Sequence, residues 1–138
     1  MVVKMGLFAL VNEYVNLLVL YQKLENSKNV DKNELSNCQN EKNIAHHRYI
    51  TKLYSSSIDE VDEFKKLLYK KVKDLYHKLS FLVSQQEKNY HKFMMGKMSE
   101  KELDSISNSI DEVMNLLRKY ENISIGIMEL DKSKTRTR

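Results

Sequence analysis

Apolar residues recur every three or four positions along most of the chain, and polar residues fill the positions between them. That spacing places the apolar side chains on one face of an α-helix. It predicts four helices, at about residues 5–24, 32–54, 58–95 and 100–130. The chain has 138 residues, no proline and three glycines, so few residues would interrupt a helix. The sequence therefore predicts an all-α fold, an elongated antiparallel four-helix bundle.

The first predicted helix is apolar around most of its circumference, and only one narrow side of it is clearly polar. Such a helix must be covered on more than one face. If two neighbouring helices cover only part of it, the remainder predicts a surface for a protein partner or a second copy. The alternative is that this helix lies centrally and is wholly buried by its own chain. The predicted partner-binding residues are Phe8, Val11, Val15, Leu18 and Val19.

Two capping boxes and a glycine predict where the third and fourth helices begin and end. Ser57 precedes Glu60 by three residues, and Ser99 precedes Glu102 by three, the spacing of a helix start. Gly96 suits the left-handed position that follows a helix end. The two long helices are therefore expected to form a hairpin with its turn at residues 97–98.

The third predicted helix is unusually long. Thirty-eight residues at 1.5 Å each extend about 57 Å. Either the molecule is elongated, or this helix bends or breaks. The apolar stripe lapses at residues 84–89, which is therefore the expected place for a break. Residues 25–37 are polar and are expected to begin as a loop, with a helix start at Asp31 and the second helix running from about residue 32.

A chain of this length fits one domain, predicted at residues 1–131. Residues 132–138 are polar and basic, and we expect a disordered tail there. Cys38 is the single cysteine, so no disulfide can form within the chain, which favours a reducing compartment. Polar residues interrupt the apolar N-terminal stretch before it reaches the length of a membrane span. These features predict a cytoplasmic protein that does not enter a membrane.

The net charge of +4 is unevenly distributed. Residues 61–98 carry a net charge of +5, and residues 99–131 carry −5. The predicted hairpin thus pairs a basic helix with an acidic one. Three lysines of the third helix share a face, and the tail adds two arginines, which together form a possible nucleic-acid site. These residues are Lys66, Lys70, Lys73, Arg136 and Arg138.

Motifs for catalysis or metal binding are missing from the sequence. His46 and His47 are adjacent and would point in different directions on a helix. Glu87 and His91 share a helical face, but the Glu-x-x-His spacing of di-iron bundles does not occur. We therefore expect no enzyme, no cofactor, no metal ion and no small-molecule substrate.

The leading hypothesis from sequence is a non-enzymatic protein-binding module that acts through its first helix. An adaptor, an export-type chaperone, a small inhibitor, or an accessory protein of a phage or virus would each fit this class. One alternative is a nucleic-acid-binding or nucleocapsid-like helical protein that uses the lysine face and the basic tail. Another is a structural coiled-coil spacer.

Overall fold

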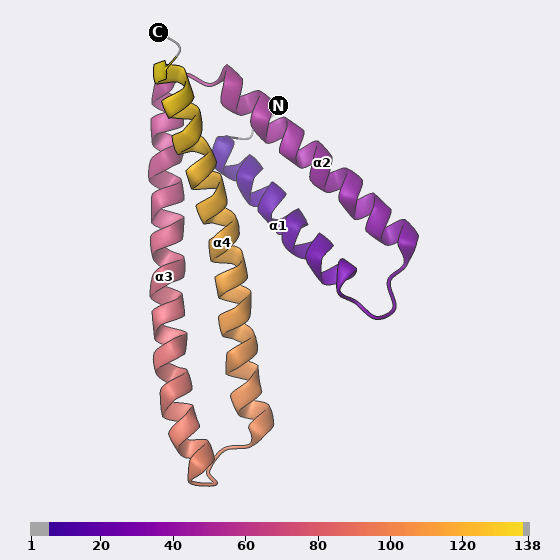
Figure 1. The fold of residues 1–138 in the computed structure, drawn as a ribbon, viewed down its shortest axis with the longest axis vertical. Helices are drawn as coiled ribbons and strands as arrows, with labels where there is room; N and C mark the ends of the chain where they lie inside the picture. Colours follow the sequence, from indigo (N-terminus) through magenta and orange to yellow (C-terminus); the bar gives the residue numbers. More distant parts are fainter. Residues whose placement is uncertain (1–5, 137–138) are drawn as a thin grey trace, which may run out of the picture. The chain divides into compact units, whose positions relative to one another are not determined.

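The computed structural model describes the backbone of residues 6–136 and the side chains of residues 6–129. It contains four helices: α1 (Leu7–Glu25), α2 (Lys32–Ser55), α3 (Ile58–Met94) and α4 (Glu100–Arg136) (Figure 1). The described residues include no β-strand. The predicted all-α fold with four helices and a long hairpin of α3 and α4 is therefore confirmed.

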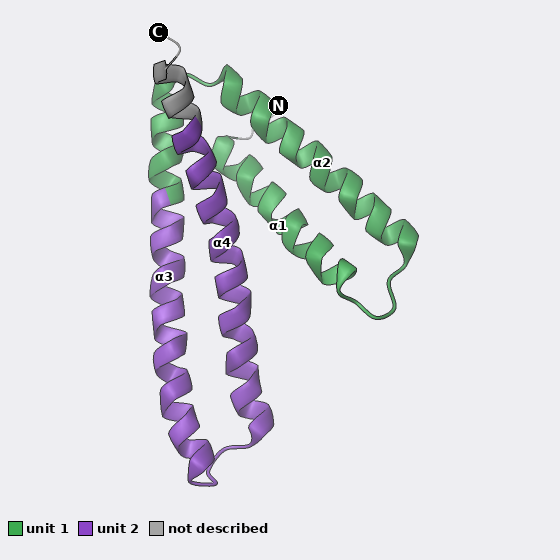
Figure 2. Ribbon diagram, in the orientation of Figure 1, with its two compact units in different colours: residues 1–68 green, residues 69–138 purple. Residues whose placement is uncertain are grey.

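The chain divides into two compact units (Figure 2). The first, residues 1–68, contains α1, α2 and the beginning of α3, and the second, residues 69–138, contains the rest of α3 and α4. α3 contributes residues to both units. The single domain expected at residues 1–131 stays a prediction.

In the first unit, α1 and α2 lie side by side as a hairpin. The carboxylate of Asp31 accepts a hydrogen bond of 2.9 Å from the backbone N–H of Asn33, which caps the start of α2. The Ser57 hydroxyl oxygen accepts a hydrogen bond of 3.2 Å from the backbone N–H of Glu60 and caps α3. These two helix starts agree with the sequence prediction.

The core of the first unit contains an aromatic pair. Phe64 is only 2% exposed, and its ring meets the edge of the Tyr49 ring at a centroid distance of 5.9 Å. Burial raises the pKa of Tyr49 to about 12, so its hydroxyl remains neutral over the physiological range. Phe64 thus joins the start of α3 to α2.

The turn between α3 and α4 follows the prediction closely. Gly96 has a φ of 72°, the left-handed conformation that glycine adopts without steric cost. The backbone N–H of Lys97 donates to the Lys92 oxygen at 2.8 Å, and that of Gly96 donates to the Phe93 oxygen at 3.0 Å. This pair of bonds is a Schellman motif, which satisfies the last carbonyls of α3.

The two long helices pack through a seam of positions that alternate at steps of three and four residues. α3 does not break at residues 84–89, so the possibility of an interruption there is excluded. The seam of the second unit includes Val72, Leu75, Leu79 and Leu82 of α3, and Ile110, Val113, Leu117 and Tyr120 of α4.

α4 is longer than the sequence predicted. It continues past Leu130 to Arg136, so residues 132–136 of the expected disordered tail are helical. Residues 137 and 138 lie outside the described residues. Gly126 lies within α4, and the residues around it are helical as predicted, although isoleucines alternate there as in a strand.

Candidate interaction surface

A row of apolar side chains runs along α3, outside its seam with α4. Tyr69, Tyr76, Val83 and Tyr90 are spaced by seven residues. A seven-residue step turns a straight helix by only about 20° short of two full turns, so the four side chains share one side of α3. Their exposed fractions are 72%, 50%, 41% and 52%. All four side chains are therefore accessible to solvent.

A hydrogen bond fixes which residues of α4 lie beside this row. The Tyr76 hydroxyl donates to Glu121 Oε1 at 2.9 Å, and this bond raises the pKa of Tyr76. Because the helices are antiparallel, seven residues forward on α3 correspond to seven residues backward on α4. Val83 is therefore level with Met114, and Tyr90 is level with Ser107. Tyr90 and Ser107 line the same pocket.

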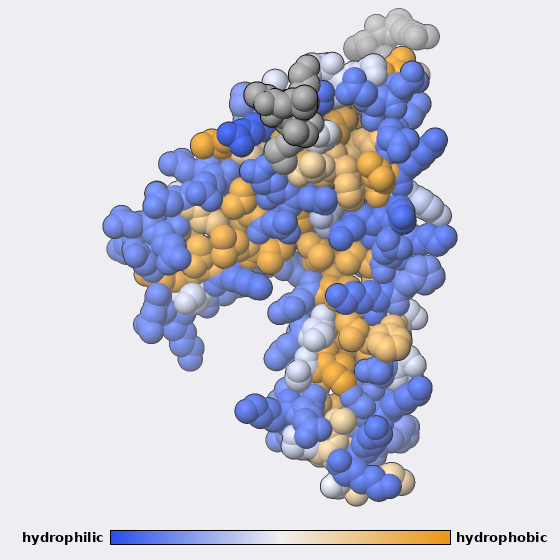
Figure 3. Space-filling view, turned by 180° about the vertical axis from the view of Figure 1, so that it is seen from behind, coloured by the Kyte–Doolittle hydropathy of each residue, from blue (hydrophilic) through white to orange (hydrophobic). Residues whose placement is uncertain are grey.

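We call this side of the second unit the aromatic flank. On α4 it includes Met114, which is half-buried, and Ile125 and Met128, which are about half exposed. A different face of the α3–α4 hairpin, seen from behind in Figure 3, also shows hydrophobic side chains between hydrophilic ones. The residues of the aromatic flank are Tyr69, Tyr76, Val83, Tyr90, Met114, Ile125 and Met128.

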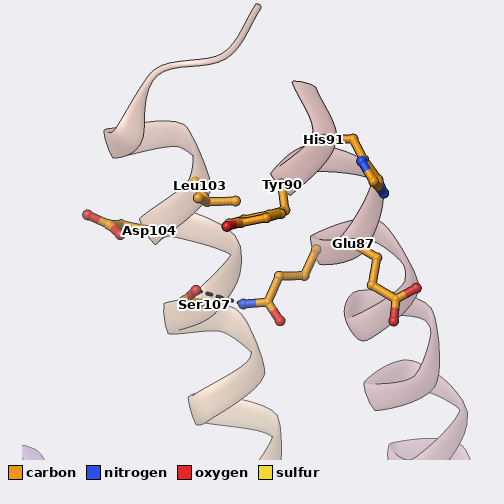
Figure 4. A pocket seen from close by; sticks show the side chains of 7 residues that line it. Glu87, Tyr90, His91, Leu103, Asp104 and Ser107 are labelled. Carbon is orange, nitrogen blue, oxygen red and sulfur yellow. Dashed lines mark hydrogen bonds between the residues drawn. The ribbon is translucent and has the colours of Figure 1, made fainter. Parts of the chain in front are cut away.

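The flank contains an open pocket of about 350 Å³ near the turn of the hairpin. The Gln86 amide donates to the Ser107 hydroxyl between α3 and α4 at 2.9 Å. The Tyr90 ring lies across the space between the helices, with Glu87 on one side and Asp104 on the other (Figure 4). The lapse in the apolar stripe that the sequence shows here thus produces a pocket and not a break.

Charged residues follow the outer edges of the aromatic flank. On α3 these are Lys73 and Glu87, and on α4 they are Arg118 and Asp111, all exposed. Each lies three or four residues from a member of the flank, which places it on a neighbouring part of the same helical surface. The basic pair lies in the half farther from the turn, where Glu121 and the exposed Glu129 also lie. The acidic pair lies nearer to the turn.

The structure changes the interpretation of the first helix. Val11 and Val15 have exposed fractions of 0%, so they belong to the core and are not accessible to a partner. Phe8, Leu18 and Val19 are half-buried. The prediction of a partner surface assumed incomplete cover for this helix, whereas its two central valines are fully covered within the chain.

Of the five residues predicted on the first helix, Phe8 also lines a second open pocket, of about 410 Å³. This pocket lies within the first unit, between the start of α1 and the start of α3. Apolar side chains form much of its wall, and three acidic residues of α3 add negative charge. Its α3 residues are Asp59, Glu60, Glu63, Phe64 and Leu67.

The structure describes four of the five residues that were predicted to bind nucleic acid. Lys66, Lys70 and Lys73 are exposed and follow one face of α3. Arg136 is the last residue of α4, and Arg138 lies outside the described residues. The lysine face adjoins Tyr69 and Tyr76 on the same helix.

The other side chains that could serve catalysis or metal binding are dispersed. Within residues 6–129, no three histidine, cysteine or acidic side chains gather as a metal site would require. Burial raises the pKa of the Cys38 thiol, which lies 3.9 Å from the Leu17 carbonyl oxygen. No described helix combines the length and the apolar character that crossing a membrane requires.

Comparisons with protein-family models, with curated proteins and with solved structures give no match to this chain. The aromatic flank is therefore interpreted from its own geometry. The row of Tyr69, Tyr76, Val83 and Tyr90 was not predicted from the sequence. The seven-residue spacing of the row was the signal that could have identified it.

Proposed function

We propose that this protein is a non-enzymatic protein-binding helical module, and that its interface is the aromatic flank. The observation that supports this proposal is the row of four exposed apolar residues along α3. A contiguous apolar surface on a monomer usually marks an interaction site, and tyrosine is enriched where binding energy concentrates. A structural spacer would need no apolar surface beyond its helical seam. An adaptor, an export-type chaperone, a small inhibitor and a viral accessory protein would each require one.

The geometry of the flank suits protein recognition. Its side chains lie on two helices that pack against each other. The backbone of the surface is therefore already ordered before binding, which lowers the entropic cost of association. Tyrosine provides a large contact area with few rotatable bonds and a hydroxyl that remains hydrogen-bonded, as in the Tyr76–Glu121 pair. The half-exposed state of these residues leaves apolar area for a partner to cover.

The full-length protein can test the proposal by affinity capture from its native cell extract. We expect Tyr69→Asp to reduce the captured partner at least about tenfold, because the carboxylate would be desolvated at the interface. Tyr54→Asp is the matched control, since Tyr54 is 66% exposed on α2 and lies outside the flank. If both variants capture as much as the wild type, the flank is not the binding surface.

Nucleic-acid binding is a second candidate, favoured by the exposed Lys66, Lys70 and Lys73 beside two tyrosines. In this case affinity would fall steeply with salt, and replacing the three lysines by glutamate would weaken binding at least about tenfold. A gel-shift titration of single-stranded RNA at two salt concentrations measures both effects. The absence of a shift at low salt would eliminate this candidate.

A further inference from the structure

We infer that the aromatic flank binds a second copy of this chain, with the two α3–α4 hairpins antiparallel about a two-fold axis near Val83 and Met114. This inference rests on the proposed function and specifies its partner. It follows from three properties of the flank: its symmetric spacing, its charge pattern and its dimensions.

Two of the three tyrosines of the flank are symmetric about Val83. Tyr76 and Tyr90 lie seven residues before and after it. A two-fold axis that crosses both helices at this level brings α3 opposite α3 of the second copy and reverses its direction. Tyr76 of each copy then faces Tyr90 of the other, so this contact forms twice.

The charges at the α4 edge of the flank obey the same symmetry. Arg118 and Asp111 are equidistant from a point beside Met114. The rotation therefore places Arg118 of each copy opposite Asp111 of the other. A parallel arrangement would instead bring like charges together, which is unfavourable.

The pocket near the turn fits this arrangement. Its lining combines the Tyr90 ring with the carboxylates of Glu87 and Asp104. The rotation about Val83 brings residues 75–80 of the second copy to this pocket, with Tyr76 opposite Tyr90. An aromatic ring packs well against another ring. The pocket thus faces a tyrosine from the opposite half of the flank.

The flank has the dimensions that a stable dimer needs. From Tyr69 to Tyr90 it extends about 32 Å, at 1.5 Å for each residue. Two helices whose axes lie 8–10 Å apart present a face about 20 Å wide. The product, roughly 640 Å² for each copy, falls within the range of about 600–1,000 Å² that each partner buries in a standard interface.

Sedimentation equilibrium of the full chain tests the inference by exchanging charges. We expect a mass of twice 16.3 kDa for the wild type. Arg118→Glu and Asp111→Lys should each raise the dimer dissociation constant about tenfold, because two symmetric attractions become repulsions. The double variant should return to within about threefold of the wild type. Lys78→Glu reverses a charge about 140° around α3 from Val83 and should have little effect.

A second pair of variants keeps the test independent of the charges. Val83→Asp should weaken the dimer at least about a hundredfold, because it places two carboxylates close to the axis. Phe81→Asp should not, because Phe81 is 62% exposed and points about 160° away. A monomer at high micromolar concentration, or a double charge variant no better than either single one, would overturn the inference. Flank-dependent capture of a different protein by such a monomer would still support the proposed function.

Discussion

Replacing Val15 by aspartate should destabilise the protein by about 4 kcal/mol or more, since this change buries an unpaired carboxylate. Val15 has no exposed surface, and α1 places it in the apolar core of the first unit. The variant must either desolvate the carboxylate or open this packing to water. Urea denaturation followed by circular dichroism measures the loss as a lower midpoint.

The neighbouring residue provides the control. Asn16 is exposed on the same helix, so Asn16→Asp introduces the same side chain at a solvated position. We expect it to change the free energy of unfolding by less than about 0.5 kcal/mol. A Val15→Asp variant as stable as the wild type but impaired in association would mean that α1 is an interface, as the sequence first suggested.

Phe64→Ala should lower the free energy of unfolding by about 3–5 kcal/mol, the usual cost of truncating a buried phenylalanine. The substitution removes the ring that packs edge-on against Tyr49 and leaves a cavity between α3 and α2. For a chain of this length, the melting temperature should fall by on the order of 10–20 °C. Differential scanning calorimetry records this shift directly.

Phe81→Ala is the matched control, since it truncates the same residue type on the same helix at an exposed position. Its melting temperature should remain within a few degrees of that of the wild type, about 2 °C for a change of 0.5 kcal/mol. Equal shifts for the two variants would show that Phe64 does not occupy a packed core.

The helix boundaries were predictable because their signals are local. The serine caps at Ser57 and Ser99 and the left-handed Gly96 act within four residues of themselves, and all three were identified in the sequence. The end of α4 was not predicted. Polar composition suggested disorder after Leu130, but lysine and arginine are also good helix formers and allow a helix to continue.

The accessibility of α1 could not be obtained from periodicity. An apolar pattern shows which side chains need cover, but it does not show which parts of the chain provide it. Val11 and Val15 therefore appeared equally suited to a core and to an interface, and only the packing distinguishes them. The packing also shows that Leu20, on the same helix, is about half exposed.

The aromatic flank could be identified only once the pairing of α3 with α4 was known. Tyr69, Tyr76, Val83 and Tyr90 are visible in the sequence as a seven-residue series. Their relation to Met114 and Glu121 depends on the register of the hairpin, which the Tyr76–Glu121 hydrogen bond reveals. Charge composition had indicated that a basic helix pairs with an acidic one, but it had not indicated which residues would remain outside the seam.

Oxidative cross-linking can show whether two copies meet through the aromatic flank. In a Cys38→Ala background, Val83→Cys places a single thiol close to the proposed axis, where it lies beside the same residue of the second copy. We expect a disulfide-linked dimer on a non-reducing gel for Val83→Cys and almost none for Phe81→Cys. Equal cross-linking of the two variants, or none at residue 83, would contradict the proposed dimer.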